Sequence, residues 1–124
     1  MFRLNNGMIM NQQYQNLVQK LEEITHLSGV MSTLGWDQEV MMPAGASDAR
    51  AKQIATLAGV IHERMTDPAL GECLHELKEK DFAALGEMER CNIREALYSY
   101  ELETKVSKRL VQELAELGSR GHGV

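Results

Sequence analysis

The scarcity of helix-breaking residues constrains this fold most. The 124-residue chain has only two prolines, Pro43 and Pro68, and the stretches around them repeat apolar residues at three- and four-residue spacings. That spacing places apolar side chains on one face of an α-helix, whereas a half-buried strand alternates with a period of two. No period-two segment, internal repeat or low-complexity tract competes with it. The sequence therefore predicts an all-α fold, a bundle of four to five helices.

The first helix is predicted over roughly residues 11–34. Its apolar residues form a single stripe, made up of Leu17, Leu21, Ile24, Met31 and Leu34. The main interruption follows at residues 35–45, because Pro43 disfavours helical geometry at the residue before it and Gly45 permits a turn. We expect this longest helix to end just before Trp36.

Two further helices have start signals. Ser47 is expected to cap a helix that runs to about Met65, with small residues beside its apolar face that would let a neighbouring helix approach closely: Ala49, Ala51 and Ala55. Asp67 is expected to cap the next helix, because Pro68 suits the first helical turn, where its missing N–H has no partner to lose. The buried face of this helix, which should end near residue 80, is Leu70, Leu74 and Leu77.

The last two helices are predicted at residues 85–105 and from Ser107 to a stop at Gly118. Their inward residues are expected to be Met88, Ile93, Leu97 and Tyr100 in the former, and Leu110, Val111, Leu114 and Leu117 in the latter. The predicted organisation is a flexible N-terminus at 1–10, a single helical domain at 11–117 and a glycine-rich tail at 118–124.

Composition limits the partners and the compartment. The net charge is −5 and the basic residues are scattered, which argues against a nucleic acid partner, since phosphate neutralisation needs clustered Lys and Arg. No segment approaches the ~20 apolar residues of a membrane span, and none resembles a signal peptide, so a cytoplasmic protein without a membrane partner is expected. Cys73 and Cys91 have neither metal nor redox spacing and are expected to be buried thiols.

Two His-Glu pairs approach a zinc motif without completing it. The motif needs two histidines four residues apart, because one helical turn then brings both rings to one metal. After His62-Glu63 the required position is Thr66, and after His75 it is Glu79. We therefore expect surface histidines beside solvated carboxylates, with no metal site here and none from convergence of the four histidines, His26, His62, His75 and His122.

Trp36-Asp37 is the most distinctive dipeptide. One interpretation, which we favour, is that Trp36 plugs the core where the first two helices meet, while Asp37 accepts backbone N–H bonds or pairs with Arg50. The alternative is a substrate-contact loop that includes Met42 and Pro43. The neighbouring methionine pair is expected to fill the core, with a partner-binding surface as the second interpretation.

The segment around this dipeptide resembles the N-terminal signature of the Taq-type thermostable zinc metallocarboxypeptidases. The resemblance runs from about Tyr14 to Leu117. Its most specific residues are Trp36-Asp37 with Met42-Pro43, then Arg50, Gln53, Thr56-Leu57 and His62-Glu63, then Thr66-Asp67-Pro68 with Leu70-Gly71. In that family this region forms helices packed over the active-site cleft, and the zinc ligands, the catalytic glutamate and the carboxylate-recognition motifs lie further along the chain.

The resemblance implies a region of an enzyme that removes C-terminal residues from peptides. The 124 residues contain no His-Glu-x-x-His sequence, so no catalytic or metal-binding residue carries over to them, and zinc is expected in full-length relatives only. We expect the chain alone to be inactive. It is then a truncated relative, a helical interaction or dimerisation module, or one part of a split peptidase completed by a catalytic chain.

Self-association is the last expectation. The predicted helices carry more apolar surface than one stripe each can bury, and large exposed apolar patches mark interfaces. We therefore expect a homodimer or a higher oligomer with helix-on-helix contacts.

Overall fold

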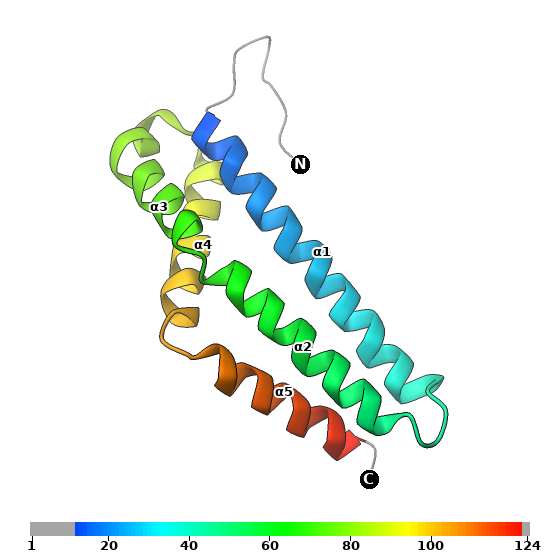
Figure 1. Cartoon of the computed structure of the whole chain (residues 1–124). Coiled ribbons are helices and arrows are strands. Elements are labelled where there is room, and N and C mark those ends of the chain that lie inside the picture. Colours follow the sequence, from blue (N-terminus) through cyan, green and yellow to red (C-terminus); the bar gives the residue numbers. More distant parts are fainter. Residues whose placement is uncertain (1–11, 123–124) are drawn as a thin grey trace.

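The computed structural model describes residues 12–122 of the chain, which form five α-helices (Figure 1). They are α1 (Gln12–Val40), α2 (Ser47–Met65), α3 (Pro68–Glu76), α4 (Glu87–Glu103) and α5 (Lys108–His122). A π-helical turn at Leu77–Asp81 and a 3-10 turn at Phe82–Ala84 connect α3 to α4. No strand occurs within this part of the chain, so the all-α prediction is confirmed.

The helices form two groups that share α1. In Figure 1, α1, α2 and α5 run side by side with α2 in the middle, while α3 and α4 gather at the N-terminal half of α1. α2 therefore contacts both of its long neighbours. None of the five helices, over the residues that the structure describes, is long and apolar enough to cross a membrane.

The main core lies where α1, α3 and α4 meet. Its buried members are Tyr14, Leu17, Leu70, Cys73, Leu74, Leu77, Ile93 and Leu97. The three leucines predicted for the third helix are all among them, because their spacing keeps them on one face. Burial raises the pKa of the Cys73 thiol. Cys91 is exposed, so the expectation of two buried thiols is correct for Cys73 alone.

A second contact joins α2 to α5 through small side chains. Ala51, Ala55 and Ala58 on α2 are buried, and a methyl group at Gly59 would collide with Gln112 of α5. The expected close approach of a neighbouring helix is therefore present at Ala51 and Ala55, although Ala49 is exposed. Small residues on one helix let the backbone of the other come near.

The orientation of α5 differs from the prediction. Its buried or half-buried face is Val111, Gln112, Ala115 and Ser119, so Leu110, Leu114 and Leu117 point away from α2 and are exposed. The small face fits the alanine stripe of α2, and the bulkier leucine face does not. α5 also continues through Gly118 to His122, so the predicted stop there is wrong.

Of the three helix starts predicted from capping residues, two agree with the structure and one does not. Asp67 accepts a hydrogen bond from the Ala69 N–H (2.9 Å), and Ser107 accepts one from Leu110 N–H (3.1 Å), so both predicted caps are confirmed. α2 starts at Ser47 itself and its cap position is Ala46, which makes no side-chain cap hydrogen bond, so the prediction that Ser47 caps this helix is wrong.

The end of α1 also differs from the prediction, because this helix continues through Trp36 to Val40. Met88, expected inward, is exposed. The expected flexible segment at 1–10 lies outside the described residues.

Truncating the core should destabilise the protein far more than truncating a surface leucine. Leu74 is fully buried, so Leu74→Ala should lower the free energy of unfolding by ~2–5 kcal/mol through lost burial and the cavity left behind. The matched control is Leu102→Ala, because Leu102 is 46% exposed on α4. Urea unfolding followed by circular dichroism measures both. Equal losses for the two variants would contradict this core assignment.

Candidate functional site

The residues singled out by sequence meet at the junction between α1 and α2. Trp36 and Asp37 lie in the last turns of α1, Met42 and Pro43 lie in the loop at 41–46, and Arg50 lies in the first turn of α2. The extension of α1 beyond its predicted end makes Trp36-Asp37 helical, so the dipeptide is held by a helix and not by a loop.

Arg50 ties the two helices together. Its Nη2 lies 2.8 Å from Asp37 Oδ2, its Nη1 donates to the Leu34 carbonyl oxygen (3.0 Å), and its Nε donates to Gln53 Oε1 (3.1 Å). The Arg50 side chain is 15% exposed, so these charge-assisted bonds are partly shielded from water. The predicted pairing of Asp37 with Arg50 is confirmed.

Backbone hydrogen bonds shape the loop that follows. The N–H groups of Met41 and Met42 both donate to the Asp37 carbonyl at 2.8 Å, which closes the last turn of α1. The Pro43 carbonyl accepts from the Ala46 N–H (3.2 Å), and Gly45 has a φ of 93°, a conformation that other residues adopt only with strain. The Asp37 side chain itself is used for Arg50, and its main-chain carbonyl holds the loop.

Trp36 does not plug the core. Its side chain is 60% exposed, which makes the interpretation that we favoured wrong for this structure. The reason is helical geometry: successive residues turn by about 100°, so a helix that aims Asp37 at Arg50 turns Trp36 away from α2. Val40 and Met41 are also exposed, at 58% and 64%, and Met42 is half-buried. Of the two methionines that were expected to fill the core, Met41 does not, and only Met42 is partly covered.

His62 and Glu63 contact the end of α4 and the start of α5. His62 is buried, and its Nδ1 lies 3.1 Å from Glu103 Oε2, at the end of α4. Because a carboxylate only accepts hydrogen bonds, this nitrogen carries the hydrogen. Glu63 Oε1 lies 2.7 Å from Nζ of Lys108, the first residue of α5. The expectation of a solvated surface histidine is therefore wrong at His62.

His26 and His75 each lie on a different helix from His62. His75 Nδ1 lies 2.8 Å from the Gly71 carbonyl one turn earlier, and His26 is exposed on α1. The side chain of His122 lies outside the described residues. Within the described part of the chain, no three His, Cys, Asp or Glu residues gather in an arrangement that could hold a metal ion.

Two features escaped the sequence analysis. The partners of His62-Glu63 lie about 40 residues away, and no periodicity links them. A groove between α1 and α4, closed on one side by α3, also carries no sequence signal. Asn92 of α4 reaches across it and donates to the Tyr14 hydroxyl of α1 (3.1 Å).

Ion pairs of Asp48, in the first turn of α2, make the stability of the contact between α2 and α5 depend on pH. The Arg120 guanidinium, 2.7 Å from Asp48 Oδ1, holds the pKa of that carboxyl below its usual value, with a smaller effect from Lys52. The pKa of the Asp48 carboxyl is therefore lower in the folded chain than in the unfolded chain. The ion pair stabilises the fold fully at a pH above the unfolded-state pKa, and this stabilisation is lost as the pH falls through the folded-state pKa. Both side chains are well exposed, so the link is weak.

Removing the Arg50 guanidinium should loosen the junction. Arg50→Ala leaves Asp37 without its ion pair and the Leu34 carbonyl without its extra donor, and should cost ~1–3 kcal/mol of unfolding free energy. Arg50→Lys should recover only part, because an ammonium group cannot reproduce the planar fork of donors. Lys52→Ala on the same helix, which breaks a well-exposed pair, is the control and should stay within ~0.5 kcal/mol. Urea titration of the three variants checks this, and a full rescue by lysine would count against it.

The helices and the junction described above lie in a region that is similar to known proteins. Residues 16–123 match the sequence profile of the carboxypeptidase Taq (M32) metallopeptidases. Over 107 residues the chain is 35% identical to thermostable carboxypeptidase 1 of Thermus thermophilus, an alignment that takes in 86% of this chain and 21% of that protein. The chain thus spans about a fifth of the length of this relative. No solved structure matches it. Because the profile extends over both helix groups and the Arg50 junction, the chain belongs to the carboxypeptidase Taq (M32) metallopeptidase family.

Proposed function

We propose that this chain is the N-terminal helical layer that covers the active site of a zinc-dependent metallocarboxypeptidase, and that it hydrolyses no peptide by itself. The observation that carries the proposal is the family match over residues 16–123, which corresponds to about a fifth of the relative's length. The enzyme that it serves would remove C-terminal residues from peptides.

The residues present do not fit a catalytic zinc ion. Hydrolysis of this kind needs metal ligands, an open coordination position and a positioned base. The nearest match is His62-Glu63, but the His62 ring is buried against Glu103 and Glu63 is paired with Lys108. Thr66, where the motif needs its second histidine, donates from its hydroxyl to the His62 carbonyl. These side chains brace helices, and we assign no catalytic step to them.

The junction supplies a rigid apolar surface for the proposed covering role. The bonds of Arg50 set the end of α1, and Trp36, Val40 and Met41 are exposed there. Exposed apolar side chains on a well-fixed backbone suit contact with another protein segment or with a peptide. In the proposed enzyme, these three side chains face the catalytic remainder or its substrate.

A catalytic partner chain would complete such a layer. The free thiols of Cys73 and Cys91 suit the cytoplasm that we expect for this assembly. A helical dimerisation module is the second candidate function, and the exposed leucines of α5 favour it.

Zinc analysis and a peptidase assay on the purified chain test the proposed inactivity. After exhaustive dialysis the chain should hold no stoichiometric zinc and should release no C-terminal residue from a peptide. Full-length thermostable carboxypeptidase 1 of Thermus thermophilus serves as the parallel control. Stoichiometric zinc together with release of C-terminal residues would overturn the proposal, and His62→Ala would then show whether that residue is a ligand.

A chimera tests the covering role itself. The matching segment of the Thermus enzyme is replaced by residues 16–123 of this chain, and the product is compared with the same enzyme lacking the segment. We expect the chimera to regain carboxypeptidase activity that the shortened enzyme lacks. A folded chimera with no more activity than the shortened enzyme would contradict the role.

A further inference from the structure

The last helix presents a row of leucines that the described helices leave exposed. Leu110, Leu114 and Leu117 are 45%, 59% and 66% exposed, and their spacing of four and three residues places them on one face of α5. In Figure 1, α5 forms the edge of the three-helix layer, and it packs on α2 through its opposite face. Single exposed leucines are common on soluble proteins, but three in one row are typical of a helix face that another segment covers.

Charged side chains on one flank of the leucine row pair with one another along α5. Arg109 Nε lies 3.0 Å from Glu113 Oε1, and Arg120 Nη2 lies 2.9 Å from Glu116 Oε2. A turn of about 100° per residue puts all four residues on the same flank of the row. Each cation meets an anion one turn away, so a segment that packs on the leucines need not desolvate an unpaired charge among these four. This border therefore suits an apolar partner.

The row continues into a position without a side chain. Gly121 follows Leu117 by four residues on the same face of α5, and a Cβ built there would meet no atom within 4 Å. From Leu110 to Gly121 the row is about 16 Å long, or about three helical turns, at 1.5 Å per residue. A helix that lies along the row can contact the leucines and bring its backbone close at the glycine. The shape of the row therefore fits the apolar face of another helix.

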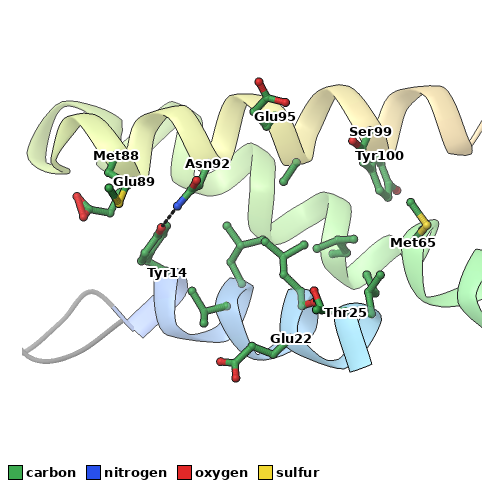
Figure 2. A pocket seen from close by; sticks show the side chains of 16 residues that line it. Tyr14, Glu22, Thr25, Met65, Met88, Glu89, Asn92, Glu95, Ser99 and Tyr100 are labelled. Carbon is green, nitrogen blue, oxygen red and sulfur yellow. Dashed lines mark hydrogen bonds between the residues drawn. The ribbon is translucent and has the colours of Figure 1, made fainter. Parts of the chain in front are cut away.

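The position of the row separates it from the other large apolar surface, the groove between α1 and α4. On the function proposed above, the catalytic remainder follows α5 in the chain. Gln38 donates to Ser119, so the last turns of α5 lie beside the end of α1. The groove in Figure 2 runs along the first half of α1, at the opposite end of that helix. A segment that follows α5 is therefore nearer to the leucine row, and a short connection favours the contact because it raises the effective concentration.

We propose that the leucine row of α5 is the surface on which the catalytic remainder of the carboxypeptidase docks, through the apolar face of one of its helices. The inference rests on the proposed function and adds to it the surface of contact and the kind of segment that binds there.

Cysteine labelling in the chimera described above tests the contact directly. A maleimide should modify Leu114→Cys readily in the isolated chain, where this position is exposed, and at least about tenfold more slowly in the chimera, because the docked helix excludes solvent. Arg109→Cys is the matched control, since it lies on the flank of the same helix with a side chain that is 89% exposed, and it should label equally fast in both proteins. Peptide mass spectrometry distinguishes each introduced cysteine from Cys73 and Cys91.

A charge in the row gives a second readout. In the chimera, Leu114→Lys should speed irreversible heat inactivation at least about tenfold, because docking would bury the ammonium group. In the isolated chain the same change should leave the thermal unfolding curve, followed by circular dichroism, unchanged, since position 114 is exposed there. Leu102→Lys, the same substitution at a 46% exposed leucine of α4, is the control and should not alter the inactivation of the chimera.

Equal labelling of Leu114→Cys in the chimera and in the isolated chain would overturn the proposal. Slow labelling in the isolated chain would overturn it as well, because a second copy would then cover the row. An active chimera with an unprotected row would refute only this contact and leave the covering role intact. An inactive chimera would instead contradict the covering role and, with it, the docking.

Discussion

The Arg50 guanidinium holds the end of α1 against the start of α2, and α5 is hydrogen-bonded to the same end of α1. One residue beyond Asp37, Gln38 donates to the Ser119 hydroxyl (2.8 Å) and to the Ser119 carbonyl (2.9 Å) on α5. The last turns of α1 therefore contact both α2 and α5. The charged donors of Arg50 are mostly shielded from water and join the consecutive helices α1 and α2, while Gln38 joins the same end of α1 to α5, which is distant in sequence.

Much of the helical framework follows from the sequence. Asp67-Pro68 starts α3, Ser107 caps α5, and the leucines of α3 are buried as their spacing predicts. The error in the orientation of α5 has a physical cause: periodicity identifies apolar residues but not the surface that covers them. α5 has a small face and a leucine face, and the alanine stripe of α2 accepts the small one. At the junction, the pairing of Asp37 was predictable, whereas the exposure of Trp36 required knowing that α1 continues to Val40.

The described part of the chain exposes three apolar surfaces. Trp36, Val40 and Met41 project at one junction, the leucine row projects from α5, and an apolar groove opens between α1 and α4. A chain that matches a fifth of a larger carboxypeptidase carries these surfaces beside the main core, which α1, α3 and α4 form. These surfaces are the ones that the proposed covering role would use.

Fluorescence of the single tryptophan tests most directly the claim that Arg50 holds Trp36 outward. In the folded chain the emission maximum should already lie near that of the unfolded chain in urea, and acrylamide should quench both states to a similar extent, because the indole is 60% exposed. A native maximum shifted clearly to the blue, with a red shift on unfolding and protection from acrylamide, would show Trp36 buried and would contradict the account.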